Sequence, residues 1–222
     1  MKFDKNTVIR QIETDKIIAI VRGIYDERAD RLAESLLRGG VRLMEFTFDQ
    51  KDPVACIRAA ACMERLSGRF RGEMCIGAGT VMTPEQADLA AEAGARFLIS
   101  PDTNEDVIRL ALSHGLVSIP GALTPTEIAA AHRLGADFVK VFPADFVGPS
   151  YFKAVRAPIS HVKILAVGGV GRENLSAFLS AGAVGAGIGS ALFTKQLIAD
   201  AAWDTISENA RAIVEIARAT RP

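Results

Sequence analysis

The sequence predicts a single α/β domain over residues 1–222: a parallel (β/α)8 barrel of the TIM type with a short N-terminal helix at 3–14. Two observations support this fold class. Eight short apolar runs alternate with segments of helical periodicity, and several helical segments end in a glycine that is followed directly by a β-rich run. Strands that alternate with helices pair in parallel through right-handed crossovers, and eight such units in about 200 residues form a compact barrel.

Helix start and stop signals repeat along the chain. The segments 83–101 and 124–143 each begin with a threonine suited to cap a helix, followed by a proline at the first helical position. Glutamine or glutamate stands three residues after the threonine, as in a capping box. Each helix is expected to end at a glycine in the left-handed conformation, since glycine has no β-carbon to clash there. This exit is predicted at Gly40, Gly94, Gly135 and Gly182.

The strands are predicted from apolar runs that are short and bounded by turn residues. In chain order they fall at 16–22, 39–47, 73–79, 95–101, 115–121, 136–143, 161–169 and 181–190. The last barrel helix is expected at 203–219. An open doubly wound sheet is the alternative, but it normally carries a glycine-rich dinucleotide turn after its first strand. The segment VRGIYDERAD that follows here is not GxGxxG.

Composition limits the partners of the protein. The chain has 222 residues, 49% of them hydrophobic, with 26 basic and 26 acidic residues and a pI near 6.8. This balance argues against a general attraction to nucleic acid or to an anionic membrane, while a local anion site stays open. The N-terminus has no apolar core of a secretory signal, and no apolar run approaches the roughly 20 residues that span a bilayer. We therefore expect a cytoplasmic protein.

Neither cysteines nor histidines form a metal-binding pattern. Cys56, Cys62 and Cys75 show no CxxC spacing, and the three histidines of the chain are dispersed. Reduced thiols in a cytosolic protein are the simpler interpretation, and no metal or other cofactor is predicted.

Lys140 lies in the middle of the sixth predicted strand, among apolar residues. Because side chains alternate along a strand, Lys140 shares a face with Phe138 and Phe142, and two valines share the other face. If the valines face the helices, Lys140 points into the barrel mouth, where active sites of such barrels form. A buried ammonium is costly unless it is paired or loses its proton.

Glu45 can reach the same place from the second strand, on the face it shares with Leu43 and Thr47. Two interpretations are open. Glu45 and Lys140 could form a buried ion pair without a reactive role, or the lysine could extend past the strand end. Alternatively, desolvation could lower the lysine pKa so that a neutral amine attacks a carbonyl and forms a Schiff base, with Glu45 transferring protons.

The last two strands end in glycines that suit an anion. Gly168 and Gly169 end the seventh strand, and Gly189 and Ser190 end the eighth. Backbone N–H groups without side chains around them can approach an anion, and barrels commonly bind phosphate at this place. The alternative is that these glycines only permit tight turns.

Two polar side chains end earlier strands. Thr80 follows the third strand in GAGTV and offers a hydroxyl. Arg22 closes the first strand and could pair with a carboxylate through two parallel hydrogen bonds. An exposed loop arginine without a binding role is the alternative.

These motifs resemble the 2-keto-3-deoxy-6-phosphogluconate and 4-hydroxy-2-oxoglutarate aldolases. The resemblance rests on GGVRLMEFTF, IGAGTVMTPEQ, FLISPDTNEDVI, SIPGALTPTEI, GADFVKVFPAD and AVGGVGRENL, which occur in the family's order and spacing from about Ile17 to Leu192. It implies a class I aldolase without a metal, which cleaves a 2-keto-3-deoxy-6-phospho-aldonate to pyruvate and glyceraldehyde 3-phosphate, or 4-hydroxy-2-oxoglutarate to pyruvate and glyoxylate. Family members are typically homotrimers.

The resemblance also implies roles for individual residues. Lys140 matches the Schiff-base lysine, Glu45 the general acid/base, and Thr80 the residue that helps to hold the pyruvyl carboxylate. The remaining matches concern the phosphate loops and the apolar walls around the keto acid: Gly168, Gly169, Gly189 and Ser190 for the former, Pro101 and Phe142 for the latter.

Two departures from the family pattern concern the substrate. Well-described members carry an arginine four residues after the glutamate, where this chain has Asp49, so Arg22 is the candidate partner of the carboxylate. The loop often written P-T-G-G begins here with Ala166 and Val167, which removes a hydroxyl beside the substrate. The second departure resembles members that act on the galactonate-derived epimer.

Two other functions stay open from the sequence. One is a phosphate-binding barrel isomerase or epimerase that uses carboxylates without an imine, but only Glu45 is convincingly placed for it. The other is a non-catalytic sugar-phosphate binder, with Asp49 as a sign of lost activity. A small keto acid or sugar phosphate is the expected partner in each case.

Overall fold

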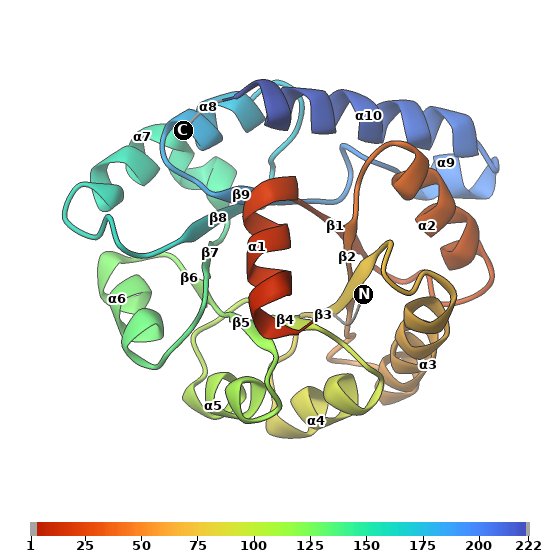
Figure 1. The fold of residues 1–222 in the computed structure, drawn as a ribbon, viewed down its shortest axis with the longest axis horizontal. Helices are drawn as coiled ribbons and strands as arrows, with labels where there is room; N and C mark the ends of the chain where they lie inside the picture. Colours follow the sequence, from red (N-terminus) through yellow and green to blue (C-terminus); the bar gives the residue numbers. More distant parts are fainter. Residues whose placement is uncertain (1–3, 221–222) are drawn as a thin grey trace.

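Strands form the centre of the molecule and helices surround them (Figure 1). The computed structural model describes residues 4–220. Within them, nine strands form one sheet in the order β5-β4-β3-β2-β1-β9-β8-β7-β6, and every pairing is parallel. The strands are β1 Ile17–Val21, β2 Leu43–Thr47, β3 Cys75–Gly79, β4 Phe97–Ile99, β5 Val117–Ile119, β6 Gly121–Ala122, β7 Val139–Val141, β8 Ile164–Val167 and β9 Gly185–Ile188.

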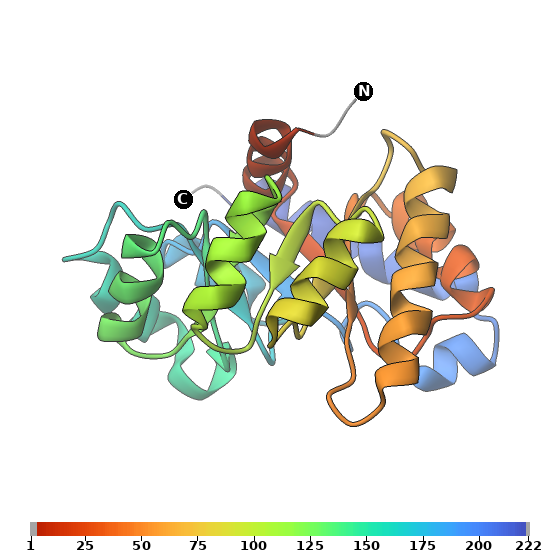
Figure 2. The ribbon, with the colours of Figure 1, turned by 90° about the horizontal axis from the view of Figure 1, so that it is seen from below.

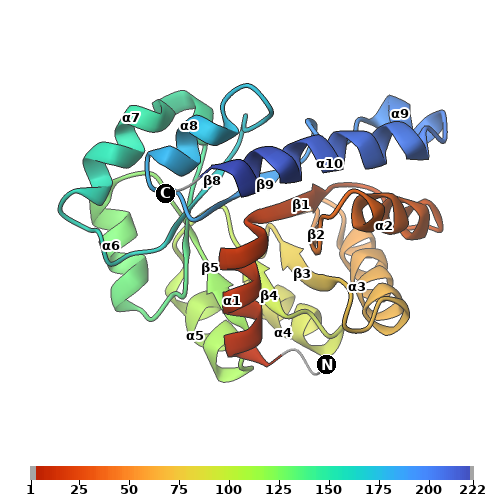
Figure 3. The same cartoon turned by 45° about the horizontal axis from the view of Figure 1, so that its top comes forward.

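The helices alternate with these strands, which confirms the predicted (β/α)8 barrel. They are α1 Lys5–Asp15, α2 Arg28–Arg38, α3 Pro53–Arg69, α4 Pro84–Glu92, α5 Glu105–Ser113, α6 Pro125–Arg133, α7 Ala144–Arg156, α8 Leu175–Ser180, α9 Lys195–Ala199 and α10 Trp203–Ala219. The last helix, α10, lies on the outside against α2 and α8 (Figure 3). Residue 3 of the predicted leading helix 3–14 lies outside the described residues. No helix of the described part is long and apolar enough to cross a membrane.

The ninth strand corrects the prediction of eight. The predicted strand 115–121 divides at Pro120 into β5 and β6, because proline has no N–H to continue a ladder. The Ile119 carbonyl accepts from Ser100 next to β4, whereas the Pro120 carbonyl accepts from the Lys140 N–H of β7 at 2.8 Å. The two ends of the sheet order are therefore consecutive in the chain, and this segment closes the barrel.

The predicted helix caps and exit glycines are present in the structure. The Thr83 side chain accepts from the N–H of Gln86, and Thr124 forms a complete capping box with Glu127. The four predicted exit glycines all have positive φ, for example +95° at Gly135.

The barrel interior is filled at one end by α1. Val8 and Ile12 of this helix are fully buried and pack in the inner apolar cluster with residues such as Phe138. Each such side chain contributes about 1.5–3 kcal/mol by leaving water. Ion pairs join α1 to residues that precede two strands: Lys5–Asp137 at 3.0 Å and Glu13–Lys163 at 2.7 Å. Figure 2 shows α1 at this end of the barrel, so the other end is left for the mouth.

Candidate active site

A cavity of about 180 Å³ lies at the carboxyl ends of the strands. All of the predicted site residues except Asp49 line it: Arg22, Glu45, Thr80, Pro101, Lys140, Phe142, Val167, Gly168, Gly169, Gly189 and Ser190. The structure adds Ile20, Val170 and Gly187, which the sequence reasoning missed. The alternation of side chains along β1 could have identified Ile20, since it lies two residues before Arg22.

Lys140 projects from β7 into this cavity. Its neighbours Val139 and Val141 belong to the outer apolar cluster beneath the helices, and Phe138 belongs to the inner one, which confirms the predicted alternation. Lys140 is only 7% exposed, and its Nζ lies 4.7 Å from the centre of the Phe142 ring. Burial lowers the pKa of the Lys140 ammonium below its ordinary value. A larger fraction of neutral amine is the chemical consequence.

Glu45 faces the same cavity from β2. It is 2% exposed, and its Oε2 is buried without a hydrogen-bond partner. Burial raises the pKa of the Glu45 carboxyl to about 7, although Lys140 and Arg22 oppose this effect. A carboxyl group with this pKa exists in both protonation states near neutral pH, as a group that both accepts and returns a proton requires.

Glu45 and Lys140 do not form an ion pair. No oxygen of the carboxyl lies within 4.0 Å of the lysine nitrogen, although each group changes the pKa of the other. The buried ion pair that the sequence left open is thus not the arrangement in the structure. Both groups instead line the same cavity and are open to a molecule bound there.

Thr80 and Arg22 form one corner of the cavity. Thr80 follows β3 with a φ of +55°, a left-handed conformation that is unusual for a β-branched residue. Its Oγ1 accepts a hydrogen bond from Nη2 of Arg22 at 3.4 Å. A guanidinium and a hydroxyl side by side suit a carboxylate.

The glycine loops form another part of the cavity wall. Gly168 and Gly169 have φ of +96° and +66°, and both follow β8. A β-carbon on Gly169 would lie 2.2 Å from Oδ2 of Asp145, so a larger residue cannot be accommodated there without movement. Gly189 and Ser190 follow β9 and line the same cavity. This wall presents backbone rather than bulky side chains, which suits an anion such as phosphate.

Asp49 does not reach the cavity. It is exposed and lines a neighbouring pocket of about 630 Å³, which shares Arg22 and Thr80 with the first. Its Oδ1 accepts the backbone N–H of Lys51 at 2.9 Å, so the carboxylate shapes its own loop.

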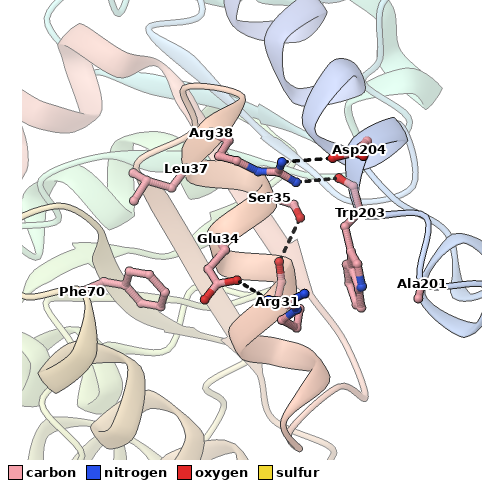
Figure 4. A pocket seen from close by; sticks show the side chains of 9 residues that line it. All are labelled: Arg31, Glu34, Ser35, Leu37, Arg38, Phe70, Ala201, Trp203 and Asp204. Carbon is pink, nitrogen blue, oxygen red and sulfur yellow. Dashed lines mark hydrogen bonds and ion pairs between the residues drawn. The ribbon is translucent and has the colours of Figure 1, made fainter.

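A further pocket, of about 620 Å³, lies outside the barrel between α2 and the start of α10 (Figure 4). Arg38 pairs there with Asp204 at 3.0 Å, and Arg31 pairs with Glu34 at 3.3 Å. These charged side chains are therefore paired with one another. The pocket includes none of the predicted site residues. Among residues 4–220, no group of three or more His, Cys, Asp or Glu side chains could hold a metal ion.

Comparison with known proteins extends this geometry. The model of the KDPG and KHG aldolase family matches residues 8–209. The chain is 38% identical over 178 residues to a probable 2-dehydro-3-deoxy-6-phosphogalactonate aldolase of Rhizobium meliloti (strain 1021), which covers 80% of this chain and 81% of that protein. It is 35% identical over 178 residues to the 2-dehydro-3-deoxy-6-phosphogalactonate aldolase of Escherichia coli (strain K12), with 80% and 84% covered.

Solved structures show the same relationship. A structure described as native KDPGal has a TM-score of 0.82 and 32% identity, over 91% of this chain and 94% of that one. The KDPG aldolase of Legionella pneumophila, with pyruvate captured as a covalent carbinolamine intermediate, has a TM-score of 0.82 and 30% identity, over 96% and 99%. The chain belongs to the KDPG and KHG aldolase family.

Proposed function

We propose that this aldolase cleaves a 2-keto-3-deoxy-6-phospho-aldonate to pyruvate and glyceraldehyde 3-phosphate through a Schiff base on Lys140. The observation that carries the proposal is the buried pair in one cavity: an amine of lowered pKa faces a carboxyl of raised pKa, and no ion pair forms between them. A class I aldolase needs a neutral amine as nucleophile and a group that moves protons. The captured carbinolamine in the Legionella relative supports the same covalent chemistry.

The chemistry follows from these two groups. The neutral Lys140 amine attacks the C2 carbonyl, and the protonated Glu45 carboxyl gives its proton to the carbinolamine hydroxyl, which leaves as water to form an iminium ion. The Glu45 carboxylate then takes the proton of the C4 hydroxyl while the C3–C4 bond breaks, and the bond electrons move into the iminium to form an enamine. Glu45 returns its proton to C3, which restores an iminium ion. Water hydrolyses this ion to release pyruvate and the free Lys140 amine, and the Glu45 carboxylate takes up the released proton. A Glu45 pKa of about 7 serves both directions of proton transfer.

The other lining residues are assigned to binding the substrate. Arg22 and Thr80 hold the keto-acid carboxylate, and Pro101 and Phe142 pack against its apolar carbons. The phosphate lies against the backbone of the glycine wall, formed by Gly168, Gly169, Gly189 and Ser190. No metal or other cofactor takes part.

We assign the galactonate-derived epimer as the preferred substrate. Val167 places an apolar side chain in the cavity where related loops carry a threonine hydroxyl. The two curated relatives described above, at 38% and 35% identity, are both named phosphogalactonate aldolases. Activity on 4-hydroxy-2-oxoglutarate, with pyruvate and glyoxylate as products, is the expected side reaction.

The test combines trapping with turnover. Borohydride with pyruvate is expected to add a three-carbon adduct at Lys140, identified by mass spectrometry of peptides. Lys163 is the internal control, because it pairs with Glu13 at the opposite end of the barrel and should stay unmodified. An adduct elsewhere, with activity intact, would contradict the lysine assignment.

Turnover is then measured with the gluconate and galactonate epimers, each with and without phosphate. Faster cleavage of the gluconate epimer would overturn the assignment of Val167. Binding of these acids without product would identify a non-catalytic binder instead. A homotrimer, a cytoplasmic location and a single domain over 1–222 stay predictions, the first of which light scattering can check.

A further inference from the structure

The strained backbone at Thr80 needs support from its surroundings. A threonine at φ +55° is in an unfavourable backbone conformation, which persists only where neighbours hold it. Its conformation sets where the hydroxyl meets Arg22, at 3.4 Å. The residues that hold Thr80 therefore influence the corner assigned to the carboxylate.

The Gln50 side chain forms a hydrogen bond with the backbone of Thr80. It comes from the loop after β2, and its Nε2 donates to the Thr80 carbonyl at 2.8 Å. The Gln50 amide also pairs with the amide of Gln86, whose Nε2 donates to Oε1 of Gln50 at 3.0 Å. Gln86 in turn accepts the Met82 N–H at 2.8 Å, in the first turn of α4. Gln50 thus links Thr80, through Gln86, to the first turn of α4.

Two hydrogen bonds of Asp49 hold the loop that carries Gln50. Oδ1 of Asp49 accepts the Lys51 N–H at 2.9 Å, and its carbonyl accepts from Sγ of Cys56 at 3.2 Å. These two contacts hold the residue that precedes Gln50 in the loop. An aspartate is therefore useful at this position for its local hydrogen bond, and not for contact with the ligand.

We infer that Gln50 is a positioning residue: through the Thr80 carbonyl it holds the Thr80 hydroxyl beside Arg22, ready for a keto-acid carboxylate. In this chain the loop residues Asp49 and Gln50 support the part of the cavity assigned to the ligand's carboxylate without contact with the ligand. Arg22 supplies the guanidinium there. The inference rests on the proposed function for the identity of the ligand.

The test compares Gln50→Met with the wild-type protein. Methionine keeps the length of the side chain and adds no charge, but it cannot donate to the Thr80 carbonyl. Loss of about one hydrogen bond's net value predicts a dissociation constant for pyruvate about five- to tenfold higher, measured by titration calorimetry. The maximal yield of borohydride-trapped imine at saturating pyruvate should stay the same, since Lys140 is not disturbed.

The matched control is Gln11→Met. Gln11 also donates its Nε2 to a backbone carbonyl, that of Arg42, but at the opposite end of the barrel. The Gln11→Met variant should bind pyruvate with the dissociation constant of the wild type. A second comparison uses Asp49→Ala and Asp49→Asn, which remove the same charge. Asparagine keeps an oxygen for the Lys51 N–H, so Asp49→Asn is expected to bind pyruvate more tightly than Asp49→Ala.

The outcomes separate this inference from the proposed function. Wild-type affinity in Gln50→Met, or a loss of maximal trapping without weaker binding, overturns the role of Gln50. If the wild type binds pyruvate but forms no trapped imine, the Schiff-base mechanism fails, and weaker binding by Gln50→Met still supports the positioning role. If the wild type binds no pyruvate at all, both are overturned.

Discussion

Gly79 leaves the space that the Glu45 carboxyl occupies. A β-carbon built on Gly79 would lie 2.6 Å from the carboxyl carbon, well inside van der Waals contact. The two residues come from neighbouring strands, β3 and β2, which pair in parallel along their whole length. The absence of a side chain at the end of β3 is thus a condition for the buried carboxyl of the site.

Gly79→Ala is expected to displace Glu45 and to reduce turnover at least about 100-fold, because misplacement of a catalytic group by about 1 Å has this effect. Overpacking should also destabilise the fold by about 1–3 kcal/mol. Gly68→Ala is the control: its β-carbon meets nothing within 4 Å in α3, and it should raise stability by about 0.5 kcal/mol. Aldolase assays and urea unfolding measure both. Full activity in Gly79→Ala would show that Glu45 need not lie where the structure places it.

Glu45→Gln is expected to separate imine formation from turnover. Glutamine has the same shape but carries no exchangeable acid proton, so turnover should fall by about 10²–10⁴-fold. Pyruvate should still be trapped on Lys140 by borohydride, at a slower rate. Steady-state cleavage and mass spectrometry of the adduct are the measurements. Unchanged turnover would remove Glu45 from the mechanism.

Glu45→Gln should also change the pH dependence of stability. The folded pKa of about 7 lies above the ordinary value of 4.5, so the folded protein favours protonated Glu45. The wild type therefore keeps this contribution below pH 4.5 and loses it as the pH rises to 7. The loss is on the order of 3 kcal/mol at high pH. Urea unfolding from pH 4.5 to 8.5 should show Glu45→Gln gaining stability over the wild type; parallel curves would contradict the raised pKa.

Lys140→Met is expected to abolish cleavage and to stabilise the fold. The lysine is 7% exposed and has no ion-pair partner within 4.0 Å, so an apolar side chain of similar length removes a desolvation cost. The gain should be about 1–3 kcal/mol at pH 7. Urea unfolding checks stability, and an assay for pyruvate checks activity. A loss of stability would mean that the amine is better solvated or paired than the structure shows.

Gly169→Ala tests whether the glycine wall binds the substrate phosphate. The new β-carbon would approach Oδ2 of Asp145 to 2.2 Å at a φ of +66°, so the loop must move. We expect kcat/KM for the phosphorylated substrate to fall about tenfold or more, as one good charge-assisted contact is lost. The unphosphorylated acid should be affected much less. Equal losses for both substrates would argue that the phosphate lies elsewhere.

Much of the fold was predictable because its signals are local. The caps at Thr83 and Thr124 and the exit at Gly135 depend on hydrogen bonds and φ values within a few residues. The alternation that directs Lys140 to the interior is likewise a property of one strand. The residues around the cavity were predictable except Ile20, Val170 and Gly187, since they lie in or directly after strands whose ends meet at one mouth.

The sequence alone thus determined the barrel, the order of its strands and the side on which Lys140 emerges. Only the tertiary structure decided that Pro120 splits a strand to close the barrel, that Glu45 and Lys140 stay unpaired, and that Gln50 reaches Thr80. These relationships join residues from different strands and loops. Their distances depend on strand register and on packing across the closed sheet, which no single segment of the sequence specifies.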